Sequence, residues 1–259
     1  MMKSHLLRPV PAVVLLACAL PAQHLAPGKN SVVLRGQAQE VHSYPAAGGR
    51  TGALLFLPGD GGWRGFAVDI ASGASSCGYD VFGWDTKVYL EGFTPGRATL
   101  TEAQVAADFR AMAGMLTRGN PERLVVAGWS EGAGLALLGA ASADSRTAFR
   151  GLLTMGLPVR GFLGWRLADS LTYLTKRDPD EPHFDTAPLL ARVSPLPLAM
   201  IHSSGDEYVT VDQTQRMFAG AAEPKRFFLV KARDHRYSGN QADFFRVLRE
   251  ALEWIQATH

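Results

Sequence analysis

The chain has 259 residues, of which 47% are hydrophobic and 19% charged, enough apolar sequence for the core of one large α/β domain but not of two. It contains 26 Lys and Arg residues and 24 Asp and Glu residues. Lys3 and Arg8 lie in an N-terminal segment without carboxylates, so the remaining charges balance. This balance argues against a nucleic-acid partner. The sequence also contains no motif that predicts a metal site or a cofactor.

Residues 1–27 have the pattern of an export signal. Lys3 and Arg8 precede an apolar run at residues 10–20, which is shorter than the roughly 20 residues of a membrane span. Small residues and prolines follow this run. We therefore expect an exported protein, periplasmic or membrane-anchored, with a single folded domain at residues 28–259.

Two cleavage signals compete at the end of the apolar run. Leu15-Leu-Ala-Cys18 is similar to a bacterial lipobox, in which the cysteine is lipidated after cleavage. Cleavage after Ala19 or Ala22 is the alternative. In either case Cys77 remains as a single cysteine, so we expect no intrachain disulfide.

Strand and helix patterns alternate along the rest of the chain, which predicts a mostly parallel sheet with helices on both faces. The predicted strands cover residues 32–35, 40–44, 53–57, 79–84, 123–127, 150–155, 196–202 and 226–230. The predicted helices cover residues 65–76, 101–116, 133–141, 211–220 and 241–255.

The sequence Gly128-Trp-Ser130-Glu-Gly132 lies between a buried strand and a helix of small residues. It fits the nucleophile elbow G-x-S-x-G, in which a serine occupies a strained strand-to-helix turn. Ser130 is therefore the predicted nucleophile, with Trp129 as a candidate substrate contact and the amide of Glu131 as a candidate oxyanion-hole donor. The alternative is a glycine-rich turn with an incidental serine.

A glycine-dense loop at residues 58–63 follows the strand at 53–57. In this architecture the loop one βα unit before the nucleophile supplies the other half of the oxyanion hole. Asp60 and Gly61 are the candidate amide donors, and Trp63 is a candidate substrate contact. The loop lacks the spacing and the lysine of a phosphate-binding loop.

The strand at 79–84 ends at Asp85, and we expect a loop at residues 87–97 that carries Tyr89. Loops that leave the carboxyl ends of parallel strands line the site in open α/β sheets. Asp85 and Tyr89 are therefore further candidate substrate contacts, although the aromatic residues of this loop can equally be packing residues.

Residues 158–190 interrupt the alternation of strands and helices. A helix carrying Phe162 and Trp165 is expected there, before a polar stretch at residues 176–182. An insertion at this point commonly covers the elbow as a lid, and a solvated surface excursion is the equal alternative.

A serine nucleophile needs a histidine base, and the histidine needs a carboxylate to fix its tautomer. If the order is serine, acid, histidine, the base follows the strand at 226–230, and His235 does so. Asp206 follows the preceding strand and is the predicted acid, with Glu207 and His202 as less favoured partners. The predicted triad is thus Ser130, Asp206 and His235.

Residues 53–255 resemble the α/β-hydrolase superfamily. The motifs Pro58-Gly-Asp-Gly-Gly-Trp63, Gly83-Trp-Asp85, Thr101-Glu-Ala-Gln-Val-Ala-Ala-Asp108 and the elbow are also similar to the bacterial VirJ/AcvB group. The resemblance implies an exported serine hydrolase. AcvB-type members hydrolyse lysyl-phosphatidylglycerol, which implies the aminoacyl ester of a membrane lipid as the substrate.

Three carboxylates are candidates to contact this substrate, because Asp60, Asp85 and Glu131 follow the carboxyl ends of neighbouring strands. They would oppose a developing oxyanion unless they point away or meet a cation, such as a lysyl ammonium. The alternative is that they are solvated or cap helices. A generic esterase, thioesterase or peptidase, and a non-catalytic partner-binding protein, remain as other functions.

Overall fold

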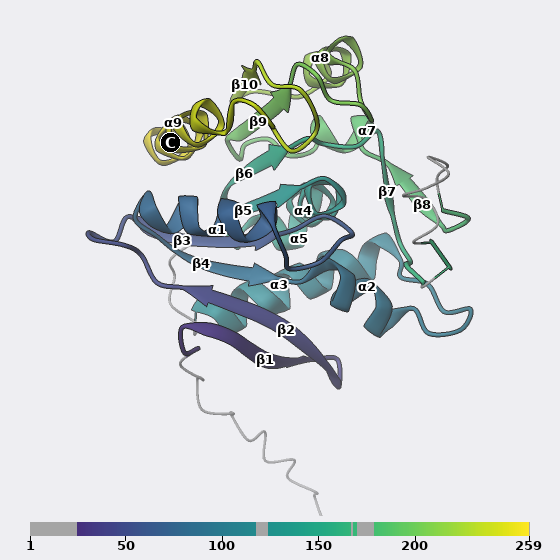
Figure 1. Cartoon of the computed structure of the whole chain (residues 1–259). Coiled ribbons are helices and arrows are strands. Elements are labelled where there is room, and N and C mark those ends of the chain that lie inside the picture. Colours follow the sequence, from purple (N-terminus) through teal and green to yellow (C-terminus); the bar gives the residue numbers. More distant parts are fainter. Residues whose placement is uncertain (1–24, 118–123, 167, 170–178, 259) are drawn as a thin grey trace, which may run out of the picture.

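The computed structural model describes residues 25–117, 124–166, 168–169 and 179–258 (Figure 1). Its main feature is an eight-stranded sheet with the strand order β1-β2-β4-β3-β5-β6-β9-β10. The first two strands pair antiparallel with each other, β2 also pairs antiparallel with β4, and all later neighbours are parallel. The predicted α/β-hydrolase architecture is confirmed.

The eight strands of this sheet are β1 (Gly28–Leu34), β2 (Gln37–Tyr44), β3 (Gly52–Leu57), β4 (Tyr79–Trp84), β5 (Leu124–Trp129), β6 (Phe149–Met155), β9 (Leu198–Ser203) and β10 (Lys225–Val230). A separate antiparallel pair consists of β7 (Arg160–Phe162) and β8 (His183–Asp185). The helices are α1 (Phe66–Ser76), α2 (Thr86–Phe93), α3 (Glu102–Thr117), α4 (Glu131–Ala141), α5 (Ala143–Arg146), α7 (Ala187–Leu190), α8 (Val211–Ala219) and α9 (Gln241–Ala257).

Two helical layers cover the sheet. Helices α1 and α9 share one apolar cluster with one face, whereas α3 and α4 share a second cluster with the other (Figure 1). Strands β3 and β5 are the two central strands of the eight-stranded sheet, and their aliphatic sequences suit burial on both faces. Helix α4 is buried along its whole length, which is why its residues are small or apolar all round.

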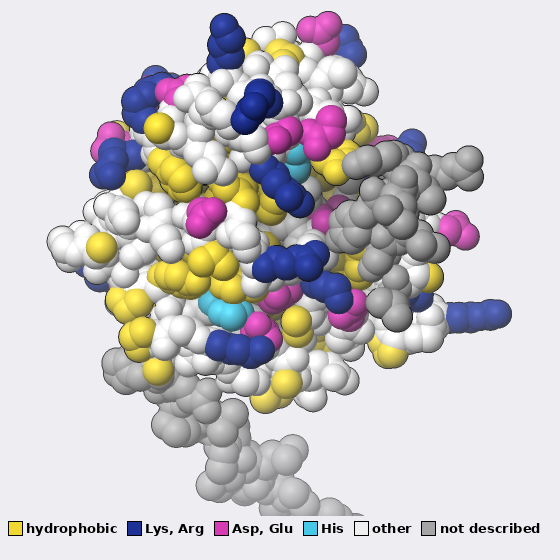
Figure 2. Space-filling model, in the orientation of Figure 1, with side chains coloured by type: hydrophobic (Ala, Val, Ile, Leu, Met, Phe, Trp, Pro, Cys, Tyr) yellow, Lys and Arg dark blue, Asp and Glu magenta, His cyan; other side chains and the backbone are white. Residues whose placement is uncertain are grey.

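The surface carries mixed charge. Basic and acidic side chains are interspersed over the face shown in Figure 2, with small hydrophobic areas between them. None of the helices described by the structure is long and apolar enough to cross a bilayer.

Two local predictions are wrong. Residues 87–97 are not all loop, because α2 occupies Thr86–Phe93; the carboxylate of Asp85 caps it by accepting the N–H of Val88 at 3.1 Å. Phe162 belongs to strand β7 rather than to a helix, and Trp165 also lies outside any helix. Much of the expected helix lies outside the described residues. The same holds for residues 1–24 of the predicted export signal, which include Cys18.

The described parts of the 158–190 insertion are packed onto the domain. The N–H of Leu100 donates to the carbonyl of Leu163 at 2.8 Å, and the N–H of Phe162 donates to the Glu131 carboxylate at 2.7 Å. Trp165 and Phe184 are buried in the core. These contacts tie the described parts of the insertion to the rest of the domain, and the role of the insertion as a lid stays a prediction.

Candidate active site

Ser130 lies in the sharp turn between β5 and α4. Its φ of 57° and ψ of −129° are strained for a residue other than glycine, as the elbow requires. Its N–H donates to the carbonyl of Met155 at 3.0 Å, which ties the turn to the end of β6. A Cβ at Gly59 would come within 3.5 Å of Ser130 Oγ, so this glycine keeps one side of the hydroxyl open.

The elbow forms because two glycines allow close backbone approach. A Cβ at Gly128 would lie 2.1 Å from the carbonyl oxygen of Gly132, and a Cβ at Gly132 would lie 2.3 Å from the carbonyl oxygens of Leu57 and Pro58. Neither position can accept a side chain without moving backbone. The glycines of the motif thus serve the contact between β5, α4 and β3.

Asp206 and His235 are paired, as predicted. Asp206 follows β9 and His235 follows β10, and the Asp206 Oδ2 atom lies 2.6 Å from His235 Nδ1. The other carboxylate oxygen accepts the N–H groups of Tyr208 at 2.9 Å and Val209 at 3.1 Å. Burial alone would raise the pKa of Asp206, but the bond to His235, its charge and these N–H groups hold that pKa below its usual value.

The imidazole of His235 is packed between the end of β6 and the elbow. A Cβ at Gly156 would lie 2.5 Å from its Cε1, so the ring rests directly on this glycine. Gly156 follows Met155, whose carbonyl accepts the Ser130 N–H. Ser130 and His235 therefore meet the same short backbone segment from different loops.

Trp129, a predicted substrate contact, lies against the histidine. Its ring stacks on His235 with 5.5 Å between centroids, and its Nε1–H donates to the His235 carbonyl at 3.3 Å. The His235 Nε2 atom is buried and has no hydrogen-bond partner in the structure. Since Nδ1 is bound to Asp206, Nε2 is the nitrogen left to exchange a proton.

The two less favoured partners have other contacts. Glu207 accepts the backbone N–H of His235 at 2.8 Å, which holds the histidine loop against the acid loop. His202 is buried, with its Nε2 3.0 Å from the carbonyl of Val209 and its Nδ1 4.0 Å from Asp206 Oδ2. Burial lowers the pKa of His202, which favours its neutral form.

The candidate oxyanion donors lie on either side of the elbow. Asp60 and Gly61 form a half-buried turn after β3. Glu131 begins α4, where first-turn amides have no acceptor inside the helix. Its carboxylate points to Phe162 N–H at 2.7 Å, so the side chain holds strand β7.

Asp85 and Tyr89 are corrections to the predicted substrate contacts. The two Asp85 oxygens accept the N–H groups of Trp63, at 2.8 Å, and of Val88. Tyr89 is 0% exposed and its hydroxyl donates to Asp108 at 2.8 Å. Asp85 caps α2 and Tyr89 is a buried residue within it, whereas the sequence pattern had placed Tyr89 in a loop.

The contacts of Trp63 also differ from the prediction. Its ring stacks on His42 at 4.6 Å between centroids, and its Nε1–H donates to the Tyr44 hydroxyl at 3.3 Å. A Cβ at Gly83 would lie 1.7 Å from this ring, so the indole covers β4 directly. Trp63 therefore anchors the loop at residues 58–63 to the sheet, and its role as a substrate contact stays a prediction.

A residue that the sequence analysis missed is Tyr208. It is 57% exposed, and its ring meets the His235 ring edge-on at 5.2 Å between centroids. Its place two residues after the predicted acid was the available signal, because a residue so near the triad aspartate in sequence must lie close to the histidine.

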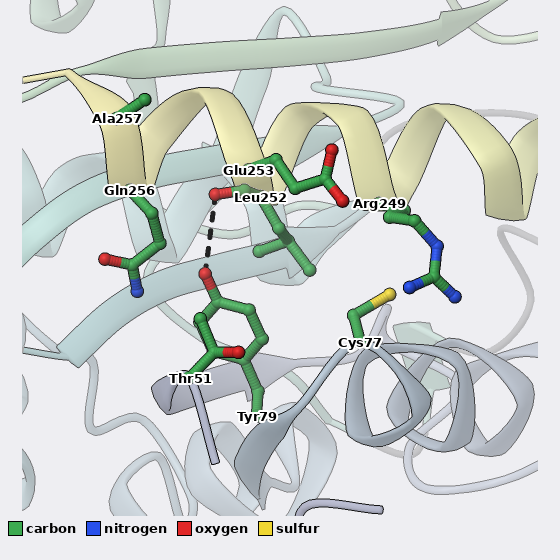
Figure 3. Close-up of a pocket in the computed structure, with 8 residues that line it drawn as sticks. All are labelled: Thr51, Cys77, Tyr79, Arg249, Leu252, Glu253, Gln256 and Ala257. Atoms are coloured by element: carbon green, nitrogen blue, oxygen red, sulfur yellow. Dashed lines mark hydrogen bonds between the residues drawn. The ribbon is translucent and has the colours of Figure 1, made fainter. Parts of the chain in front are cut away.

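A cavity of about 370 Å³ lies at the opposite edge of the sheet (Figure 3). It lies where β3 and β4 begin, and Tyr79 within it donates to the carbonyl of Leu252 at 3.4 Å. Burial raises the pKa of this tyrosine to about 12. None of the predicted triad residues lines this cavity. The candidate active site is therefore defined by the contacts of Ser130, Asp206 and His235. No group of three potential metal ligands occurs within the described part of the chain.

The sheet topology and the elbow show that this protein has an α/β-hydrolase fold. Similar solved structures include the α/β hydrolase GrgF from Penicillium sp. sh18, at 15% identity and a TM-score of 0.66 over 90% of this chain and 99% of that one. An α/β serine hydrolase homologue from Coxiella burnetii has 13% identity and a TM-score of 0.63 over 89% and 100%.

A third similar structure is described as a membrane phospholipase A, a novel bacterial virulence factor. It has 15% identity and a TM-score of 0.65 over 89% of this chain and 87% of that one. Residues 52–159 match the family described as bacterial virulence protein (VirJ), which confirms the resemblance drawn from the sequence motifs. No curated protein sequence matches the chain.

Proposed function

We propose that this protein is a serine hydrolase that cleaves esters through Ser130, His235 and Asp206. The observation that carries the proposal is the state of His235: its Nδ1 is 2.6 Å from a buried carboxylate, while its Nε2 is buried and unpaired. Most buried polar atoms have a hydrogen-bond partner, and the general base of such a triad is a histidine with one ring nitrogen on the acid and the other open to the nucleophile. The elbow geometry of Ser130 supplies the matching nucleophile.

The reaction follows from these positions. Ser130 Oγ attacks the ester carbonyl while His235 Nε2 accepts its proton, and Asp206 stabilises the imidazolium that forms. The amides of Gly61 and Glu131 donate to the oxyanion, with Asp60 as the alternative donor on the first loop. His235 then returns the proton to the leaving alcohol, and the acyl group stays bound to Ser130 Oγ. In the second half of the reaction water attacks this acyl group while His235 Nε2 accepts its proton, and Ser130 Oγ leaves with that proton.

A fluorophosphonate probe tests this proposal directly. We expect the wild-type protein to gain one covalent adduct, mapped by peptide mass spectrometry to Ser130, and Ser130→Ala protein to gain none. Labelling of both proteins at the same rate would exclude Ser130 as the nucleophile. A complete lack of labelling in folded wild-type protein would favour the non-catalytic, partner-binding function.

We propose further that the ester is the aminoacyl ester of a phospholipid such as lysyl-phosphatidylglycerol. The VirJ match supports this substrate, and so does the fold shared with a protein described as a membrane phospholipase A. Asp85 and the carboxylate of Glu131 bind backbone N–H groups. Asp60 follows Gly59, which lies against Ser130, so Asp60 is our candidate for the carboxylate that meets the lysyl ammonium.

Purified protein should therefore hydrolyse lysyl-phosphatidylglycerol faster than a neutral short-chain ester. Asp60→Asn should lower this preference by about 5- to 150-fold, the range of a partly desolvated charged contact. Alanyl-phosphatidylglycerol is the matched control, since it lacks the side-chain ammonium. Equal rates on all three esters, unchanged by Asp60→Asn, would favour a generic esterase.

We also propose export, with an anchor at Cys18, on the sequence pattern of residues 1–27 alone. Several acyl chains on one cysteine would hold the protein at a membrane surface, whereas a single chain binds only marginally. Mass spectrometry of the mature protein should find an N-terminal acylated Cys18. A mature chain that begins after residue 19 or 22 without an acyl group would exclude the anchor and retain export.

A further inference from the structure

Tyr208 is an exposed aromatic residue at the reaction centre. The exposed large hydrophobic residues among those described are Val33, Met115, Val159, Tyr208 and Leu229. Val33 and Leu229 lie on β1 and β10, the two edge strands, and Met115 lies on the outer side of α3. Their exposure follows from these outer positions.

Tyr208 and Val159 have a different location. They lie on the loops that follow β9 and β6, which are neighbours in the sheet. The carboxyl ends of adjacent parallel strands meet at one edge, and this edge carries Ser130 and His235. Exposed apolar side chains at that edge can contact a substrate without any rearrangement of the core.

The ring of Tyr208 has a fixed relation to the triad. Its backbone N–H donates to Asp206 Oδ1 at 2.9 Å, so its main chain moves together with the triad carboxylate. Its ring contacts the His235 imidazole at 5.2 Å between centroids and at an interplanar angle of 80°. One part of the ring thus faces the general base, while more than half of the residue faces outward.

We propose that Tyr208 is a specificity-determining residue, whose ring packs against a hydrocarbon part of the bound ester. This rests on the proposed serine hydrolase function. Covering the exposed ring removes apolar surface from water, and each methylene that it covers adds to the affinity. The preference for a long alkyl chain over a short one is the property that this contact controls.

The test compares two fluorophosphonates, one with an ethyl and one with a decyl chain, by their second-order rates of labelling Ser130. We expect Tyr208→Ala to lower the ratio of decyl to ethyl rates by about 5- to 10-fold, with the ethyl rate changed less than about threefold. Tyr208→Phe, which retains the ring, and Val33→Ala, an exposed apolar residue on β1, should retain the wild-type ratio.

The outcomes separate a substrate contact from support of His235. Equal losses for both probes in Tyr208→Ala would mean that the ring only holds the imidazole, and an unchanged ratio would mean that it contacts no substrate. Either result overturns the specificity role while leaving the hydrolase proposal in place. Failure of the wild-type protein to be labelled at Ser130 would overturn both.

Discussion

Two buried carboxylates at the same edge of the sheet have opposite surroundings. Both oxygens of Asp85, after β4, accept backbone N–H groups, from Trp63 and Val88. One oxygen of Asp206, after β9, accepts backbone N–H groups, while the other binds His235, whose second ring nitrogen is unpaired. The first arrangement is complete within the fold, and the second leaves a buried polar atom available for a reacting group.

The unpaired ring nitrogen marks Asp206 and His235, rather than Asp85, as candidates for the reaction. A buried polar group without a partner costs about 1 to 3 kcal/mol. A reactive group retains that cost until substrate binds. Substitutions on the two sides of the comparison should therefore change different measured quantities.

The largest effect is expected at the reactive pair. His235→Ala should lower kcat by several orders of magnitude, and Asp206→Asn by roughly 10⁴-fold, because the amide no longer fixes the histidine tautomer. Steady-state hydrolysis of an activated ester measures both. A near-normal rate for Asp206→Asn would indicate that Glu207 is the acid. A near-normal rate for His235→Ala would indicate that His202 is the base.

A second effect concerns the close contact beneath the elbow. Gly132→Ala places a Cβ 2.3 Å from two carbonyl oxygens, so we expect a loss of roughly 3 kcal/mol in the free energy of unfolding and slower labelling of Ser130. Gly114→Ala in α3 is the control, since nothing lies within 4 Å of its added methyl. Urea denaturation should show a gain of up to about 1 kcal/mol for that variant. Equal stability changes in the two variants would contradict the elbow geometry.

A third effect should separate stability from activity at the satisfied side. Tyr89→Phe removes the hydroxyl that donates to Asp108 at 2.8 Å and leaves the Asp108 bond to Arg35 at 2.7 Å in place. We expect the free energy of unfolding to fall by about 1.5 to 3 kcal/mol, as for a bond to a charged group. The kcat and KM of the folded enzyme should be unchanged. A raised KM for the long-chain ester would restore Tyr89 as a substrate contact.

The smallest effect is the pH dependence contributed by His202. Burial lowers the pKa of His202 in the folded state, so below the usual value of about 6.5 the unfolded chain binds more protons at this residue. The free energy of unfolding should therefore fall with decreasing pH from about 6.5, by at most about 1.4 kcal/mol per pH unit. Urea denaturation between pH 7 and pH 5 should show a smaller slope for His202→Gln. Parallel curves would mean that His202 does not titrate in this way.

Local patterns predicted much of the fold and the reactive centre. Strand β4 at Tyr79–Trp84 matches the predicted range, and the other sheet strands differ from theirs by a few residues. The central strands β3 and β5 are largely aliphatic runs, a signal that does not depend on distant contacts. The predicted acid and base were found side by side because their strands are adjacent, which the alternation of strands and helices already implied.

The substrate contacts were predicted less well. Tyr89 and Trp63 were assigned from their proximity in sequence to strand ends, yet Tyr89 is a buried residue of α2 and Trp63 covers β4. The Asp85 side chain caps α2 with one oxygen and accepts the N–H of Trp63, in the loop at residues 58–63, with the other. No sequence pattern predicts that one side chain serves both segments.

The sequence by itself determined the alternation of strands and helices, the elbow and the identity of the three proposed triad residues, because each follows from local patterns and from the order of residues along the chain. Tertiary structure alone decided which polar atoms are satisfied. Glu131 meets Phe162 N–H and Glu207 meets His235 N–H across 31 and 28 residues, respectively. These pairs form only when separate loops pack together, and hydrogen-bond satisfaction is a property of that packing rather than of either residue.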